Sequence, residues 1–390
     1  MKNNMRREAQ KYAGIAIMVF IFAAVPLHMY GQTHLAVDIE DPVYRILEYG
    51  ELTGTLKRLS SVKPYSKSSV SIYLEEMARA GWPAYERSIL NSFAIRYGPA
   101  DNGLAAGNFA YRGENSSVLL GVDLLSEFRV NANSLSDWHM YNLIRGYLKG
   151  DMSRYVSYYG CFGFTFDKID PMSFAPYSFT KSWDGDHIGF GDPRYSVTGI
   201  EEVPYFGFFM ETDITAQFLD NDLLLRFARL RRDWGTGEGS LTLSGTARPF
   251  LGVDLHIRPA PWLSLSHTTG SLSNNVEEVY VQGDDPGPSY QKMYTVQQLE
   301  IIPFDWLHLG ATASIIWGKR LEFGYMAPLL YSVIYQNTLG NFENAAQEVS
   351  VKFIVPPFGS VYFSFFADEM ELTNLAEFGK RPRNMIAFQA

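Results

Sequence analysis

Apolar and polar side chains alternate along several segments of about ten residues, from Phe109 toward the end of the chain. Successive side chains of a β-strand point to opposite faces, so each segment predicts a strand with one apolar and one polar face. The clearest apolar rows are Val118, Leu120, Val122, Leu124 and Phe128; Phe206, Phe208, Met210, Ile214 and Phe218; Leu251, Val253, Leu255 and Ile257; Leu307, Leu309, Ala311, Ala313 and Ile315; and Val349, Val351, Phe353 and Val355. About fourteen such strands fit into this part of the chain, which is therefore expected to be mainly β.

Composition indicates what the two faces contact. Aromatic residues make up 15% of the chain, yet the mean hydropathy is only -0.10, as expected when one face of each strand meets lipid and the other meets water. Short links at 259–261 and 303–305 alternate with long polar links at 167–204 and 271–292. Aromatic side chains that suit the girdles of a membrane barrel cluster near the expected strand ends: Trp138, Tyr141, Tyr155, Tyr158, Tyr159, Trp262, Trp306, Trp317 and Tyr331. The predicted fold is a large antiparallel transmembrane β-barrel, with a soluble β-sandwich as the alternative.

Residues 1–31 have the layout of a secretory signal peptide. Four basic residues, Lys2, Arg6, Arg7 and Lys11, precede the apolar run 14–27. Pro26 and His28 shorten that run, which favours a cleaved peptide over an N-terminal membrane anchor. Export and a barrel fold together predict the outer membrane of a diderm bacterium, with outer-membrane lipid and the outer-membrane assembly machinery as partners.

Between Asp41 and Gly98 the apolar spacing changes to that of helices. Asp41-Pro42 is a helix start, and Ser68 or Ser69 is expected to cap a second helix that ends at 81–83. A third helical run covers 85–97. Three short amphipathic helices need one another or the barrel for burial, so 41–98 is predicted to be a periplasmic helical subdomain and 109–390 the barrel.

Charge and cysteine content exclude several classes of function. The net charge of -9 argues against a nucleic-acid partner, which requires a basic face. Cys161 is the single cysteine, so a disulfide framework and a cysteine-rich metal site are excluded. The sequence indicates no cofactor.

The densest basic run of the barrel region contains Arg226, Arg229, Arg231 and Arg232, followed by Trp234. Strand parity cannot place all four arginines inside the barrel, and interfacial charges near a strand end are an equally good interpretation. The arginines that do face inward, together with Trp234, are candidate contacts for an acidic polysaccharide through guanidinium–carboxylate pairing and ring stacking. Gly235, Gly237 and Gly239 predict a sharp turn after Trp234, and the alternation in 241–244 predicts a strand leaving it.

The segment WGTGEGSLTLSGTARPF, at 234–250, resembles the WG-x-G-x-x-GSL-x-LS-x-x-A-x-PF pattern of the Wzi capsule-assembly family, with Thr236 where that family has proline. The helical start around DPVY at 41–44 and the late segment at 340–344 are similar to the same family. The resemblance covers most of the chain beyond the signal peptide. It implies an outer-membrane barrel that holds capsular polysaccharide at the cell surface without catalysis. A porin-like channel is the alternative function, and an outer-membrane hydrolase is the third.

Two other groups of residues suggest sites. If Arg258 faces Trp262 across the 259–261 turn, Ser264 faces His256 and Ser266 faces Asp254, which gathers residue types used in nucleophilic catalysis. Asp184, Asp186 and Asp192 could supply oxygen ligands for calcium, but the EF-hand spacing is absent and a solvated acidic loop is favoured. Neither group is assigned a catalytic or metal-binding role.

The C-terminal residues 384–390 begin an alternating segment and then stop. A barrel needs its first and last strands to pair, because unpaired backbone groups are costly in lipid. The wall is therefore expected to be incomplete, with an open or strained seam near Phe109 and Ala390 and the closing strands missing.

Overall fold

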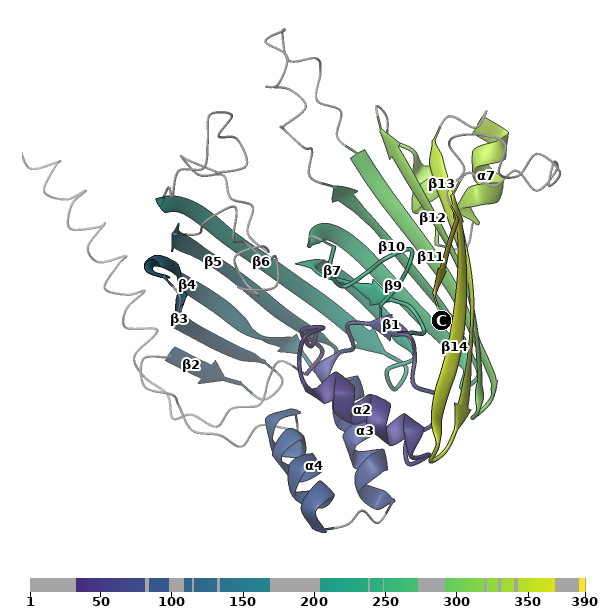
Figure 1. The fold of residues 1–390 in the computed structure, drawn as a ribbon, viewed down its shortest axis with the longest axis horizontal. Helices are drawn as coiled ribbons and strands as arrows, with labels where there is room; N and C mark the ends of the chain where they lie inside the picture. The colour runs from purple at the N-terminus through teal and green to yellow at the C-terminus, as the bar shows by residue number, and fades with distance from the viewer. Residues whose placement is uncertain are drawn as a thin grey trace, which may run out of the picture.

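The computed structural model describes residues 33–80, 84–97, 109–113, 116–131, 134–168, 204–237, 239–247, 249–272, 292–318, 321–328, 331–339, 343–368 and 386–389. These residues form one large antiparallel sheet, a layer of helices at one end of it, and segments that fold into its concave side (Figure 1). Among them, no helix is both long enough and apolar enough to cross a membrane.

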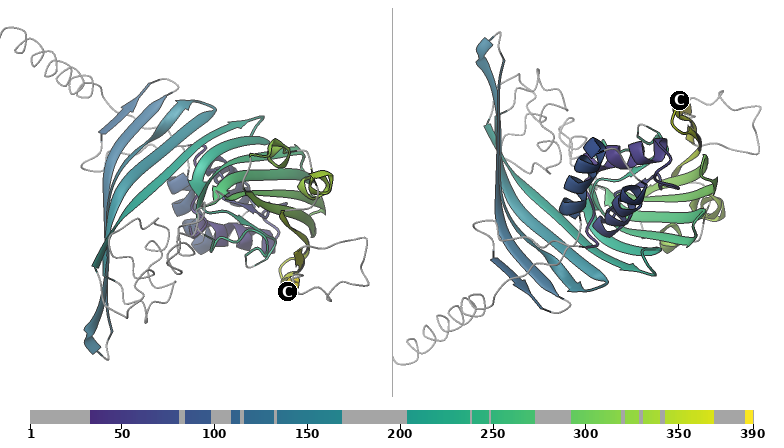
Figure 2. Two further views of the ribbon diagram at one scale, coloured as in Figure 1. Left: turned by 90° about the horizontal axis from the view of Figure 1, so that it is seen from above. Right: turned by 90° about the horizontal axis from the view of Figure 1, so that it is seen from below.

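The sheet contains thirteen strands, each hydrogen-bonded to its neighbours in chain order. The strands are β2 (Phe109–Arg112), β3 (Ser117–Asn131), β4 (Ser134–Ser153), β5 (Val156–Lys168), β6 (Pro204–Phe218), β7 (Leu223–Leu230), β9 (Phe250–Ala260), β10 (Leu263–Leu272), β11 (Lys292–Phe304), β12 (Leu307–Gly318), β13 (Asn344–Val355), β14 (Gly359–Asp368) and β15 (Ile386–Gln389). The sheet curls around the helices, while β2–β6 extend away from them (Figure 2). The prediction of a mainly β, antiparallel barrel wall is confirmed.

The two faces of the wall differ as the alternation predicts. On β3, Leu124 is 76% exposed on the convex face, and Val349 on β13 is 59% exposed. On the concave face Asp213, Gln217 and Glu300 are buried. An apolar outer face and a polar interior are typical of a wall embedded in lipid.

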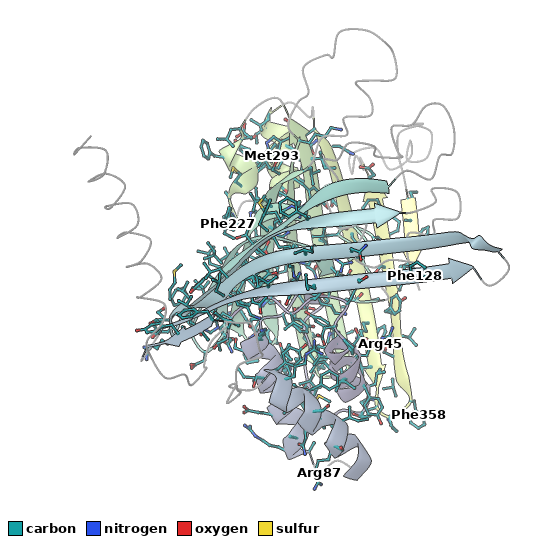
Figure 3. All side chains as sticks on the ribbon, turned by 90° about the vertical axis from the view of Figure 1, so that its left-hand side faces the viewer. Arg45, Arg87, Phe128, Phe227, Met293 and Phe358 are labelled. Atoms are coloured by element: carbon teal, nitrogen blue, oxygen red, sulfur yellow. The ribbon has the colours of Figure 1, made fainter. Side chains whose placement is uncertain are left out.

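The strands are joined by short turns at one end of the sheet. These turns are 153–156, 218–223, 260–263, 304–307 and 355–359. At the other end the connections span 168–204, 230–250, 272–292, 318–344 and 368–386, apart from the tight link between β3 and β4. This asymmetry confirms the short and long links expected from the sequence. Figure 3 shows Phe358, in one of the short turns, at the same end of the molecule as Arg87 of the helical layer.

Three helices lie at the short-turn end: α2 (Val43–Leu52), α3 (Lys67–Arg79) and α4 (Ala84–Tyr97). Asp41 Oδ1 accepts a hydrogen bond from Val43 N at 2.9 Å, as its position before the helix predicts. The cap of α3 is Ser66, whose Oγ accepts from Ser69 N at 3.1 Å. The prediction of Ser68 or Ser69 as the cap was wrong, because the helix starts at Lys67. The apolar faces of the helices share one core that includes Leu47, Leu56, Val70, Leu74 and Met77.

The helical subdomain is docked on the inner wall through buried polar contacts. Glu300 on β11 accepts hydrogen bonds from Ser61 N at 2.8 Å and from Ser60 Oγ at 2.9 Å. On α2, Glu51 accepts from Lys352 Nζ on β13 at 2.6 Å. Burial raises the pKa of the Glu51 carboxyl, and the nearby Lys352 opposes that shift. The carboxylates of Glu300 and Glu51 therefore connect the helical subdomain to the wall through buried hydrogen bonds.

The segment 231–249, between β7 and β9, folds into the concave side of the sheet instead of leaving it. Its strand β8 (Asp233–Trp234) pairs with β1 (Val62–Lys63), which lies between α2 and α3. We call 231–249 the inner segment. The inner segment and the N-terminal residues therefore occupy the interior together.

Within the described residues, β2 and β15 are each hydrogen-bonded on one side only, and no pairing joins them. The wall is open between these two strands, which is where the sequence predicts an incomplete seam. Phe388 of β15 contacts Phe363 and Phe365 of β14, so the last strand is held by ring packing as well as by its ladder.

Candidate functional site

A cavity of about 260 Å³ lies between α3 and the concave face of β7, β9 and β10. From α3 it is lined by Ser69, Ile72, Tyr73 and Glu76, which recur at helical spacing on one face. From the wall it is lined by alternate residues of the inward rows, including Arg226, Asp254 and His256. Trp234 of the inner segment completes the lining. Two of the residues predicted from the sequence, Arg226 and Trp234, therefore meet in one cavity.

Arg226 lines this cavity, and its guanidinium has one buried donor without a partner. The residue is 2% exposed, and its Nε donates to Thr215 Oγ1 at 2.9 Å and lies 3.6 Å from Asp213 Oδ1. Its Nη1 donates to the Pro64 carbonyl at 3.2 Å. Its Nη2 is buried and has no hydrogen-bond partner. A buried donor that makes no hydrogen bond costs about 1–3 kcal/mol. A ligand with a hydrogen-bond acceptor would remove this cost, and an anionic oxygen would form the strongest bond.

The charge of the lining is predominantly positive. The cationic side chains are Lys57, Arg58, Lys63, Arg226 and Arg258, and the anionic ones are Glu76 and Asp254. Asp254 is already bonded to Arg232 Nε at 2.7 Å and to Thr268 Oγ1 at 2.6 Å. Lys57 and Arg258 are 60% and 37% exposed as side chains, and each is paired with a carboxylate: Lys57 Nζ lies 3.0 Å from Asp305 Oδ2, and Arg258 Nε lies 2.6 Å from Asp222 Oδ1.

Aromatic side chains supply the apolar part of the lining. Trp234 is 3% exposed, and Tyr65 and Tyr73 pack edge to face with ring centroids 5.6 Å apart. Burial raises the pKa of both tyrosines, so their hydroxyls stay protonated at neutral pH. Rings beside cationic groups are suited to a ligand that combines a sugar ring with a carboxylate.

The other arginines of the basic run lie in different surroundings. Arg229 follows Leu225 and Phe227 on the outward-facing row of β7, and its Nη1 donates to the Met210 carbonyl at 2.9 Å. Arg231 pairs with Glu40 at 2.7 Å and with Asp38 at 3.4 Å. Arg232 is buried against Asp254. As strand parity predicts, the four arginines do not share the interior.

The inner segment differs in part from its prediction. The expected strand over 241–244 was wrong, because these residues form bends whose backbone is held by side chains. Ser240 Oγ accepts from the backbone N of Thr242 and Leu243, and Thr242 Oγ1 donates to Glu348 at 2.6 Å. The expected sharp turn is present: a Cβ on Gly237 would overlap the Tyr362 ring, and Gly239 has a φ of +104°.

The predicted Ser–His–Asp register was wrong by two residues. At the turn Ala260 pairs with Leu263, which moves the register three residues from the expected one, and the bulge between Leu263 and Leu265 takes back one residue, so that Ser266 faces His256. Ser266 Oγ and His256 Nδ1 are 2.7 Å apart. Asp254 faces Thr268 and is bonded to Arg232 instead of the histidine. The structure thus contains a serine–histidine pair in the cavity without the carboxylate that orients a triad.

The remaining candidate site lies outside the described residues. Asp184, Asp186 and Asp192 all fall in 169–203. Within the part of the chain that the structure describes, no group of three or more acidic, histidine or cysteine side chains is placed to hold a metal ion.

Sequence reasoning missed the residues that α3 and its flanking loops bring to the cavity, above all Lys63 and Tyr73. Tyr73 lies within the second predicted helix, but nothing in the sequence shows which part of the wall that helix meets. Asp213 lies on the polar side of β6, between the apolar residues Met210 and Ile214 that the alternation places outside. Its approach to Arg226 follows from the pairing of Asp213 with Ala228 across β6 and β7.

No protein-family model and no curated protein matches this chain. Among solved structures, one similar chain is BamA from Haemophilus ducreyi lacking POTRA domains 1–3. The identity is 12% and the TM-score is 0.35, with 72% of this chain and 60% of that chain covered. This chain thus spans less than two thirds of that structure, and the fold assignment rests on the strand order and the two faces of the sheet themselves.

Proposed function

We propose that this protein is an outer-membrane β-barrel that binds an acidic surface polysaccharide, of the capsular kind, without catalysing a reaction. The apolar convex face supports a location in the membrane. A charged side chain on a lipid-facing surface would cost about 2–4 kcal/mol at mid-bilayer, and an apolar face avoids that cost. The resemblance of 234–250 to a capsule-assembly family supports the polysaccharide. The role is that of a lectin, with the cavity behind α3 as the binding site, which the polysaccharide would reach from the short-turn, periplasmic end of the wall.

The unpaired Nη2 of Arg226 is the observation that carries this proposal. A sugar carboxylate would satisfy that donor, while the rings of Trp234 and Tyr73 offer faces and edges to a pyranose ring. A cavity of about 260 Å³ is slightly smaller than the usual pockets for drug-sized ligands, so it suits one sugar residue of a chain. The occupied interior counts against the porin-like alternative, because residues 33–66 and the inner segment fill the concave side.

Arg226→Met is expected to weaken binding of uronic-acid oligosaccharides by about 10- to 100-fold, which corresponds to a charge-assisted hydrogen bond of about 1.5–3 kcal/mol. Arg226→Lys should lose less, because it keeps the charge but not the planar donor fork. Binding is measured by calorimetry on purified protein in micelles. The matched control, Arg154→Met, removes an exposed arginine from a short turn and should bind like the parent.

A neutral glucan serves as the second ligand. Equal affinity for the neutral and the acidic oligosaccharide would contradict the proposed recognition of a carboxylate. Unchanged affinity in a folded Arg226→Met protein would show that the polysaccharide is bound elsewhere.

The helical subdomain is expected on the periplasmic side, because the short turns of a membrane barrel face the periplasm. Trypsin added to intact cells should therefore cleave in the 167–204 link and spare 41–98, although Arg45, Arg79 and Arg87 are exposed on the subdomain. Permeabilised cells provide the control, since trypsin should then reach those arginines. Cleavage between Asp41 and Gly98 in intact cells would reverse the orientation.

A further inference from the structure

The outward-facing row of β12 changes its surroundings halfway along the strand. Leu309 is 39% exposed and Ala311 is also exposed. Further along the same row, Ile315 and Trp317 are 0% and 2% exposed. They are covered by 321–328 and 331–339, which contain α6 (Phe323–Met326) and α7 (Ser332–Leu339). We call these residues the outer cap. Figure 1 shows α7 beside the upper ends of β12 and β13, at the opposite end of the sheet from α2–α4.

Beneath the outer cap the convex face of the wall is polar. His267 and Thr269 on β10, and Thr295 and Gln297 on β11, belong to outward rows and are all buried. Gln297 Nε2 donates to the Ala327 carbonyl at 3.1 Å, and the Ser332 N donates to Gln297 Oε1 at 3.0 Å. Lipid could not satisfy Gln297, which the outer cap bonds directly, while His267, Thr269 and Thr295 are bonded to one another and to Gln297 beneath the cap.

The lipid-facing surface is too short at β12 unless the outer cap contributes to it. A membrane-spanning strand needs about 9–11 residues. On β3, exposed apolar residues run from Leu120 to Phe128. On β12, the exposed part of the row ends at Ala311, only five residues into the strand. The outer surface of the cap must therefore supply the rest of the apolar band on this side of the barrel.

The chemistry of the outer cap suits that position. Its described residues contain a single charged side chain, Glu322, which accepts a hydrogen bond from Tyr335 Oη at 2.8 Å. Leu321, Phe323 and Ile334 are 59%, 72% and 63% exposed. A helical segment in water normally carries charges on its free face. Exposed apolar and aromatic side chains with few charges are typical of elements at a lipid interface.

We propose that the outer cap is seated in the membrane, at the boundary between the lipid headgroups and the acyl chains, and that its partner is the bilayer surface itself. This inference goes beyond polysaccharide binding, since the cavity behind α3 lies at the other end of the sheet. The cap completes the lipid-facing surface where β10–β12 turn polar.

The test measures depth in vesicles. An environment-sensitive fluorophore is attached to Ile334→Cys in a Cys161→Ala background, in vesicles whose phosphatidylcholine carries a nitroxide at acyl position 5 or 12. At Ile334 the position-5 nitroxide should quench at least twofold more strongly than the position-12 nitroxide. Leu299→Cys, which is 41% exposed on the outward row of β11, should show the opposite order. Arg87→Cys, on α4, should be quenched by neither.

Phe323→Cys provides a second position on the same surface if Ile334→Cys fails to fold. A label that behaves like the one at Arg87 would place the outer cap in water and overturn the inference. Stronger quenching by the position-12 nitroxide would overturn the boundary position, since the cap would then lie among the acyl chains.

Discussion

Arg232→Met is expected to lower the free energy of unfolding by about 3–5 kcal/mol, because it leaves the buried Asp254 carboxylate without its cation. The Arg232 side chain is 0% exposed, and its Nε lies 2.7 Å from Asp254 Oδ1. The same guanidinium donates to the carbonyls of Leu230, Phe250 and Ala228 at 3.0, 3.1 and 3.3 Å. It therefore joins the ends of β7 and β9 at the point where the inner segment leaves the wall.

Urea unfolding in micelles, followed by tryptophan fluorescence, measures this loss. The double variant Arg232→Met/Asp254→Leu should recover part of it, because no unpaired charge then remains buried. Arg231→Met is the matched control. Its carboxylate partners Asp38 and Glu40 are 47% and 44% exposed, so it should cost at most about 1 kcal/mol. Equal losses in the single and the double variant would show that packing, and not the buried charge, decides the effect.

Glu300→Leu is expected to release the helical subdomain from the wall, with the undocked population rising about a thousandfold. The Glu300 carboxylate is 2% exposed and accepts from Ser61 N, Ser60 Oγ and Ser264 Oγ. Each hydrogen bond to a charged group is worth about 1.5–3 kcal/mol, so the two that reach the subdomain contribute about 3–6 kcal/mol, a range that contains the roughly 4 kcal/mol of a thousandfold change.

Amide hydrogen exchange in α2 and α3 reports this undocking, because protected helix amides become exchangeable when a subdomain opens. Glu300→Gln keeps an acceptor of the same shape and should lose much less protection. Glu48→Gln, which removes the half-exposed partner of Lys63, should change exchange little. Unchanged protection in a folded Glu300→Leu protein would mean that the apolar core and Glu51 hold the subdomain without this carboxylate.

The architecture was predictable where it depends on local periodicity. A period of two placed Leu124 outside and Asp213 inside without any knowledge of strand pairing, because a strand has only two faces. Apolar residues at helical spacing likewise predicted α2, α3 and α4, because they mark the buried face of a helix. Both are properties of a few successive residues, which the sequence carries directly.

The candidate site was predictable only in part, because its geometry depends on contacts between distant residues. The turn after Ala260 and the bulge between Leu263 and Leu265 together moved the serine opposite His256 by two positions. The alternation at 241–244 gave no strand, since Glu348, Tyr294 and Trp234 offered these residues their hydrogen-bond partners instead. The outer cap was not foreseen at all, because a polar patch on a convex face is apparent only when the strands are paired.

The pairing of β1 with β8 bears on the order in which the molecule is assembled. Val62 and Trp234 lie more than 170 positions apart in the chain, and the entropy lost in closing such a loop grows with its length. The helices precede the inner segment in the chain and pack a core of their own. If the strands paired into a curved wall first, the folded helical core would have to enter the concave side from one end of the sheet. Assembly in the opposite order avoids this step. The helical core forms first, the strands then pair around it, and β1 and β8 pair while the wall is being built.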